Sequence, residues 1–195
     1  MSEFWLYFKL GLEHVLDWKA YDHILFLIVL VACHSFHGAK RVFWLVTLFT
    51  LGHTLSLFLS TYGIISVSVK WVEFLIALTI FITAVFNIIT AKKPENRKDI
   101  TVLYIASVFF GIIHGLGFSS YFKMISAGTE SKLLPLLEFA LGIEAAQLIV
   151  VLIVLILAFI FQGVLGVTRR DWILVLSSIV IGVVLPILIE NILAL

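Results

Sequence analysis

The sequence predicts an all-α membrane protein, a polytopic bundle of about six transmembrane helices preceded by one short helix. Of its 195 residues, 62% are hydrophobic and only 13% are charged, and the mean hydropathy of +1.18 lies far above that of soluble globular domains. Apolar runs of about 20 residues, the length that crosses a hydrocarbon core of about 30 Å, follow one another along the chain. We therefore expect residues 1–195 to form a single integral membrane domain in contact with the lipid bilayer.

The first predicted element is a short helix at residues 4–18. Glu13, His14 and Asp17 are crowded into this segment, which is too short and too polar to cross a membrane. Helices of this kind lie at the membrane interface or re-enter the bilayer beside other helices. We therefore expect an interfacial or re-entrant helix.

Six apolar runs follow, and the charged residues between them set their direction. The predicted spans are residues 22–39, 42–60, 71–91, 100–120, 134–162 and 172–193. Loops on one side carry Lys40, Arg41, Lys92, Lys93, Arg97, Lys98, Arg169 and Arg170, whereas the other side carries Lys9, Lys19, Lys70, Lys123 and Lys132. Because cytoplasmic loops retain positive charge, this bias predicts a multi-pass protein of the bacterial inner (cytoplasmic) membrane with both termini outside.

Several polar residues reach a similar depth in the outer half of the predicted bundle. The helical rise places His53 about 10 Å and His114 about 9 Å below the outer ends of their spans. A charged group in hydrocarbon costs several kcal/mol unless it faces a partner, an ion or water, so these residues should point inward together. The outer group is His14, Asp22, His23, His53, Glu73, His114 and Glu138.

Imidazole and carboxylate groups without thiolate suit a divalent transition metal such as Zn, Ni, Co, Fe or Mn. Glu144 and Gln147 lie deeper and three residues apart, on one helix face. His34 and His37, three residues apart and therefore expected on one helix face, form a second pair at the inner end of the first span. The predicted metal ligands are therefore His14, Asp22, His23, His53, Glu73, His114, Glu138 and Glu144, with Gln147 as polar support and His34 and His37 as an inner exit site.

A simpler interpretation of the histidines also exists. Gly111 and Gly115 flank His114 as a small-xxx-small pair, which lets two helices approach closely, and Gly52 precedes His53. Each histidine would then only bond neighbouring helices. Three or more histidines reaching one depth from different helices favour a shared site over this interpretation.

Other classes of function are disfavoured by composition and motifs. The net charge is +1, and no basic stripe interleaved with aromatic residues indicates a nucleic-acid partner. No segment resembles a nucleotide-binding loop, so pumping driven by ATP is not expected from this polypeptide. The single cysteine, Cys33, excludes a thiolate-rich metal cage.

Five motifs together resemble the HupE/UreJ family of bacterial membrane proteins over residues 11–155. They are DHILFLIVL, FTLGHTLSL, VEFLIALTIFITAVFN, FGIIHGLGF and FALGIEAAQL. The resemblance implies a small multi-helix membrane protein for nickel or cobalt handling, a permease or an accessory to metalloenzyme maturation. The matching positions are His14, Asp22, His23, His53, Glu73, His114 and Glu144, with Gln147.

The match departs from the family in one place. The family pattern has a histidine six residues before the Asp-His pair with a glycine between them, whereas here eight residues separate His14 from Asp22 and Trp18, Lys19 and Ala20 occupy the glycine region.

Three functions remain open at this point, and the family resemblance favours metal transport over hydrolysis. A nickel or cobalt permease would bind the ion at the outer histidines and pass it inward through several weak sites. An intramembrane zinc-dependent hydrolase acting on a lipid or lipidated substrate would use Asp22, Glu73 or Glu138 as general base. The third function is a metal-handling accessory, as a homo-oligomer or within a larger complex. Whether the protein is an enzyme, and which metal it takes, stay undecided.

Overall fold

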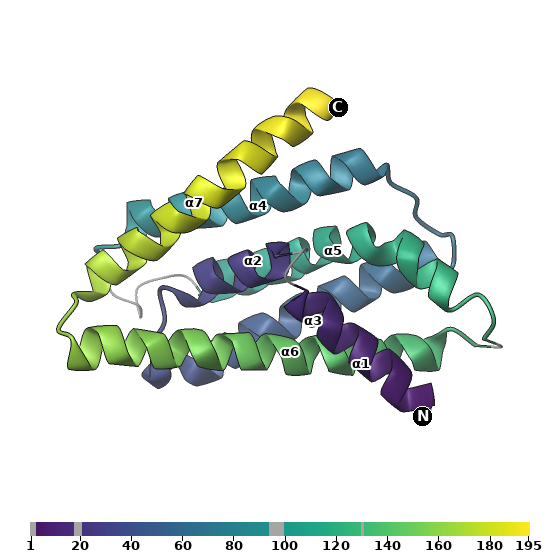
Figure 1. The fold of residues 1–195 in the computed structure, drawn as a ribbon, viewed down its shortest axis with the longest axis horizontal. Coiled ribbons are helices and arrows are strands. Elements are labelled where there is room, and N and C mark those ends of the chain that lie inside the picture. Colours follow the sequence, from purple (N-terminus) through teal and green to yellow (C-terminus); the bar gives the residue numbers. More distant parts are fainter. Residues whose placement is uncertain (1–2, 18–20, 94–99, 130) are drawn as a thin grey trace.

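The computed structural model describes residues 3–17, 21–93, 100–129 and 131–195, and within these ranges all regular secondary structure is helical. The predicted all-α helix bundle is confirmed (Figure 1). Lys19, Arg97 and Lys98, which contributed to the predicted orientation, lie outside the described residues, as do Trp18 and Ala20. The elements are α1 (Glu3–Leu16), α2 (Asp22–Val31), η1 (Phe36–Gly38), α3 (Ala39–Thr61), α4 (Val69–Thr90), α5 (Ile100–Ile125), α6 (Leu133–Phe159), η3 (Ile160–Val164) and α7 (Arg169–Ala194).

Five of these helices are long and apolar enough to cross a membrane, and their positions agree with five of the predicted spans. The first predicted span, residues 22–39, needs correction. Helix α2 ends at Val31, so its ten residues rise only about 15 Å, half the thickness of the hydrocarbon core. Helix α1, with 14 residues, is also too short to cross, as expected for the segment 4–18.

Tertiary contacts explain why α2 can end inside the bundle. The amide of Asn87 on α4 donates to the carbonyl of Val29 over 2.6 Å, and the guanidinium of Arg169 on α7 donates to the carbonyl of Cys33 over 2.7 Å. The ring Nδ1 of His34 lies 3.2 Å from the carbonyl of Leu30. These side chains bond carbonyls that a longer helix would satisfy by itself. Hydropathy cannot detect such distant partners, so the sequence predicted too long a helix.

Glycines set the closest contacts between helices α3 and α5. A Cβ atom on Gly111 would overlap the carbonyl oxygen of Phe49, and one on Gly115 would overlap that of His53. Both pairs share the same sequence offset, so α3 and α5 run parallel in a fixed register. The predicted close approach at Gly111 and Gly115 is therefore present, and it positions His53 and His114 on adjoining helices.

Helices α1 and α6 pack in the same manner but antiparallel. A Cβ atom on Gly11 would overlap the carbonyl of Phe139, and one on Gly142 would overlap the carbonyl of Phe8. Figure 1 shows α1 crossing α6, with α4 and α7 together along the opposite side of the bundle and α2 between these layers. Helix α1 begins and α7 ends toward one end of the bundle, and the turn from α6 to α7 lies at the other.

Candidate metal centre

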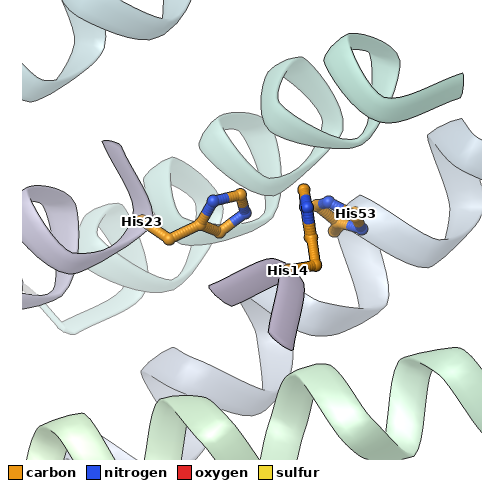
Figure 2. A group of neighbouring side chains, drawn as sticks. All are labelled: His14, His23 and His53. Carbon is orange, nitrogen blue, oxygen red and sulfur yellow. The ribbon is translucent and has the colours of Figure 1, made fainter. Parts of the chain in front are cut away.

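Three histidines from three helices converge inside the bundle. His14 lies in the last turn of α1, His23 in the first turn of α2 and His53 in the second half of α3. One ring nitrogen of each lies within 4.8 Å of the others (Figure 2). The close helix packing described above carries these side chains to one place, although 39 positions of the sequence separate His14 from His53.

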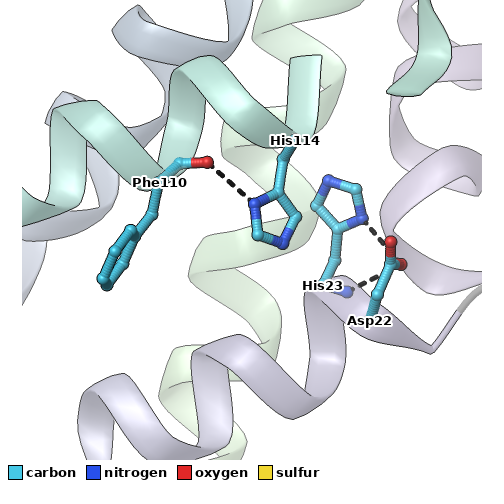
Figure 3. Close-up of polar contacts among 4 residues, drawn as sticks. All are labelled: Asp22, His23, Phe110 and His114. Atoms are coloured by element: carbon cyan, nitrogen blue, oxygen red, sulfur yellow. Dashed lines mark hydrogen bonds and ion pairs between the residues drawn. The ribbon is translucent and has the colours of Figure 1, made fainter. Parts of the chain in front are cut away.

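His114 of α5 joins this group from the side. Its ring centroid lies 5.3 Å from that of His23, and its Nδ1 lies 2.8 Å from the carbonyl of Phe110 (Figure 3). A carbonyl can only accept, so Nδ1 carries the proton and Nε2 carries the lone pair. We refer to His14, His23, His53 and His114 as the histidine cluster.

Asp22 fixes the ring of His23. Its carboxylate accepts from the backbone N–H of His23 over 2.9 Å and lies 3.2 Å from Nδ1 of the same residue (Figure 3). A carboxylate on one ring nitrogen holds the proton there and leaves the other nitrogen free to bind an ion, as in carboxylate-histidine-metal arrangements. Asp22 therefore acts on the ring of His23 in this structure.

The remaining ring nitrogens have no partner among the described residues. The buried atoms without a hydrogen bond include Nε2 of His14, His23, His53 and His114, and also Nδ1 of His53. Most buried polar atoms in proteins are hydrogen-bonded, so several such nitrogens in one place require an explanation. Burial lowers the pKa of His14 to about 3, with His23 adding to the effect, so its imidazole is neutral. Neutral imidazole nitrogens are ligands for nickel, cobalt and zinc, and the residues present therefore fit such an ion.

A cavity of about 820 Å³ leads to the cluster. His14, His23 and His114 line it, together with the exposed side chains of Glu13 and Glu73. Asp17 and Asp22 also line it, so four carboxylates surround the approach to the histidines. A concave surface with charges of one sign raises the local concentration of oppositely charged ions. The cavity is therefore suited to cations.

Three phenylalanines close the opposite side of the cluster. Helices α2, α3 and α5 each place one of them a helical turn from their histidine: Phe26, Phe49 and Phe110. The rings of Phe26 and Phe49 stack with centroids 4.9 Å apart, and Phe110 meets Phe26 edge to face at 5.7 Å. Phe26 and Phe49 have no exposed surface. This aromatic layer separates the histidines from the end of the bundle where α6 turns to α7.

Glu144 and Gln147 lie apart from the histidine cluster. The hydroxyl of Thr47 on α3 donates to a carboxylate oxygen of Glu144 over 2.6 Å, and the hydroxyl of Thr50 donates to the other oxygen. Thr50 Oγ1 also lies 3.0 Å from Oε1 of Gln147. Neither Glu144 nor Gln147 lines the cavity, so the structure gives these residues a site of their own between α3 and α6.

Glu138 is likewise outside the cavity. It is buried on α6, and one of its carboxylate oxygens has no hydrogen-bond partner among the described residues. Glu73, by contrast, does line the cavity but is exposed on α4. Of the predicted acids, Asp22 alone contacts a histidine of the cluster among the described residues.

The predicted inner pair, His34 and His37, does not share a helix face. The helical spacing assumed for them is wrong because α2 ends at Val31, and only His37 lies in a regular element, η1. His34 is buried with its ring on the carbonyl of Leu30, whereas His37 is exposed.

Sequence reasoning missed some residues that the structure places at these sites. Glu13, in the last turn of α1, and Asp17, just after the end of α1, both line the cavity. Thr47 and Thr50 are three residues apart and contact the same acid. The spacing of Thr47 and Thr50 was visible in the sequence, but their partner, Glu144, lies on another helix.

The comparisons with known proteins agree with the resemblance found in the motifs. The family model described as HupE / UreJ protein matches residues 1–190. The searches among curated proteins and among solved structures gave no match. Because the family model covers nearly the whole chain, the protein belongs to the HupE/UreJ family of membrane proteins.

Proposed function

We propose that the protein is a permease for a divalent transition metal ion of the nickel and cobalt class, in the bacterial inner membrane. One observation carries the proposal: half-buried His14 and buried His23 and His53, from three helices, bring ring nitrogens within 4.8 Å of one another, and buried His114 adjoins them, with unpartnered ring nitrogens in all four, at the end of a cavity lined by carboxylates. A structural role for the histidines would give these nitrogens hydrogen-bond partners. The metal ion is the transported substrate, and it would accept the lone pairs of the ring nitrogens that have no other partner.

In this proposal, different residues attract the ion, coordinate it and orient its ligands. The acids of the cavity, including Glu13 and Glu73, attract the hydrated cation. His14, His23 and His53 replace water on the ion, and His114 completes the set from the adjoining helix. Asp22 orients His23. Glu138 and Glu144 take no direct part at this stage.

Charge distribution supports an outward-facing cavity. Lys40, Arg41, Arg169 and Arg170 lie at the end of the bundle remote from the start of α1, where η1 leads into α3 and α6 turns to α7 (Figure 1). By the positive-inside rule that end faces the cytoplasm. Both termini and the mouth of the cavity then face outward, and the aromatic layer lies on the cytoplasmic side of the histidines.

This arrangement matches one state of a transporter that works by alternating access. The ion reaches the histidines from one side only, and the aromatic layer must repack before it can leave on the other. His34 and His37 remain the proposed groups nearest the exit. The hydrolase alternative has no support from the family match, and an accessory role in delivering metal to another protein would use the same histidine cluster.

Metal binding to purified protein tests the proposal. We expect the native chain to bind one Ni²⁺ or Co²⁺, and His53→Ala and His114→Ala each to lose this binding because they remove ligands from the cluster. Isothermal titration measures the affinity, and elemental analysis of protein purified without chelator measures the content. His37→Ala is the matched control, since this exposed ring lies outside the cluster. Normal metal content in folded His53→Ala and His114→Ala would refute the proposed site.

Transport is tested separately in vesicles. Proteoliposomes that contain the native protein should accumulate radioactive nickel or cobalt faster than protein-free vesicles, and His53→Ala should abolish the difference. An accessory protein without transport activity would bind the ion but leave the vesicle content unchanged.

A further inference from the structure

The cluster of Thr47, Thr50, Glu144 and Gln147, which we call the Glu144 cluster, is not explained by the cavity or by the histidines. It joins α3 and α6 through hydrogen bonds from both threonine hydroxyls to the two oxygens of one carboxylate. Gln147 is fully buried, and its amide nitrogen has no partner among the described residues. Glu144 lies eleven residues into an apolar helix of 27 residues, far from either end.

The carboxylate has no counter-charge among the residues that the structure describes. The two ion pairs found among the described residues are Lys9 with Glu13 and His23 with Asp22, and neither includes Glu144. An ionised carboxylate inside a membrane domain costs several kcal/mol unless a cation accompanies it. An ionised Glu144 would therefore require a cation from outside the described residues.

The hydrogen bonds also leave acceptors in excess. The single hydroxyl hydrogen of Thr50 faces three of them: the carbonyl of Val46 at 3.3 Å, a carboxylate oxygen of Glu144, and Oε1 of Gln147 at 3.0 Å. One hydrogen can serve one acceptor well. The remaining oxygens have lone pairs available for a further donor or a cation.

The donor set points to the type of cation. Every atom of the Glu144 cluster that could coordinate a cation is an oxygen, from a carboxylate, two hydroxyls and a carbonyl or amide. The histidine cluster instead offers nitrogen atoms. Oxygen donors suit hard cations and imidazole suits the later transition metals, so the two sites have different preferences. With Glu144 ionised, the Glu144 cluster would carry one negative charge, which one singly charged cation would balance.

We propose that the Glu144 cluster binds a singly charged coupling cation, a sodium ion or a proton, whose binding is linked to that of the metal cargo. This inference rests on the proposed permease function. The link runs through α3, because Thr50 precedes His53 by three residues, about 4.5 Å along the helix axis. Gly115 and the carbonyl of His53 hold that part of α3 against α5. A cation that orders Thr50 therefore also positions His53, and linkage makes the effect of each ion on the other reciprocal.

Nickel titrations in detergent test the linkage. The native protein is titrated with Ni²⁺ in sodium or in a bulky organic cation at equal ionic strength, and in each case at two pH values. We expect the Ni²⁺ affinity to change at least threefold with sodium or with pH, and Glu144→Gln to lose that change while still binding Ni²⁺ at the histidines. Glu144→Gln keeps the shape of the side chain and removes its charge. Thr50→Val should reduce the effect, and Thr83→Val, on α4 with its hydroxyl bonded to its own helix, should not.

The outcomes separate the two cations and the two proposals. A sodium-dependent change that Glu144→Gln loses identifies a sodium site, and a pH-dependent change that the variant loses identifies a proton site. If the Ni²⁺ affinity of Glu144→Gln depends on sodium and pH as much as that of the native protein does, the inference is overturned. The histidine site stands in that case. If the native protein binds no Ni²⁺, the permease proposal fails, and thermal unfolding then decides the cation site. Sodium or acidification must change the melting temperature of the native protein by several degrees more than that of Glu144→Gln, and equal changes refute the site.

Discussion

Asp22 and His23 are neighbours in the sequence, and their contact determines which nitrogen of His23 remains free. A carboxylate on Nδ1 keeps the proton on that atom and directs Nε2 toward His14 and His53. In the same way, the carbonyl of Phe110 fixes the ring of His114. His23 and His114 are thus held in position before an ion arrives, which reduces the entropic cost of binding.

At this scale we predict that Asp22→Asn weakens Ni²⁺ binding about 10- to 100-fold, because the amide no longer holds the proton of His23 on Nδ1. Titration calorimetry measures the loss. Asp17→Asn removes a carboxylate from the same cavity, and we expect it to slow association with little change in the affinity of the bound ion. If both variants lost affinity equally, Asp22 would act through its charge alone.

Helix pairs, more than single helices, place the functional residues. The parallel pair α3 and α5 carries His53 and His114, and the antiparallel pair α1 and α6 carries His14. In both pairs, glycines face the backbone of the partner helix. Sliding one helix along its partner would therefore separate the histidine rings. Helix α2 supplies His23 because it ends early and places its first turn inside the bundle.

We therefore predict that Gly111→Ala destabilises the protein by about 1 to 3 kcal/mol, since its methyl group would overlap the carbonyl of Phe49 and force α3 away from α5. Reversible unfolding in mixed micelles measures this free energy. Gly182→Ala on α7 is the control, because nothing lies within 4 Å of the added atom. It should stay within about 1 kcal/mol of the native protein, on the stabilising side. Equal effects of the two substitutions would show that the contact between α3 and α5 is not close.

At the scale of the whole molecule, the sequence predicted the depth of each residue in the membrane better than the direction in which its side chain faces within the bundle. Five spans were located because a hydrocarbon core imposes their length. His53 and His114 lie deeper than expected, about 12 and 16.5 Å from the ends of their helices, because α3 ends at Thr61 and α5 continues to Ile125. The helical rise gives only depth, so it could not show that Glu144 faces Thr47 while His14 faces His23. Nor can apolar composition distinguish Phe49 in an aromatic layer from ordinary core.

Access to the histidines should therefore differ between the two sides of the membrane. In vesicles with one orientation, a membrane-impermeant chelator on the side of the termini should remove bound Ni²⁺ rapidly, because the cavity leads there. The same chelator on the other side should act slowly, at the rate at which the aromatic layer opens. Removal at equal rates from both sides would contradict a closed layer.

The stacked rings of Phe26 and Phe49 also have an electrical consequence. A layer of hydrocarbon between the cavity and the opposite end leaves no continuous file of water for ions to follow, so the protein in a planar bilayer should pass no unitary current at any voltage. Phe49→Ala, if it folds and keeps its metal, should introduce such a conductance by opening a gap between the histidines and the other compartment. The protein would then have changed from a carrier, which moves a few ions in each cycle, into a pore.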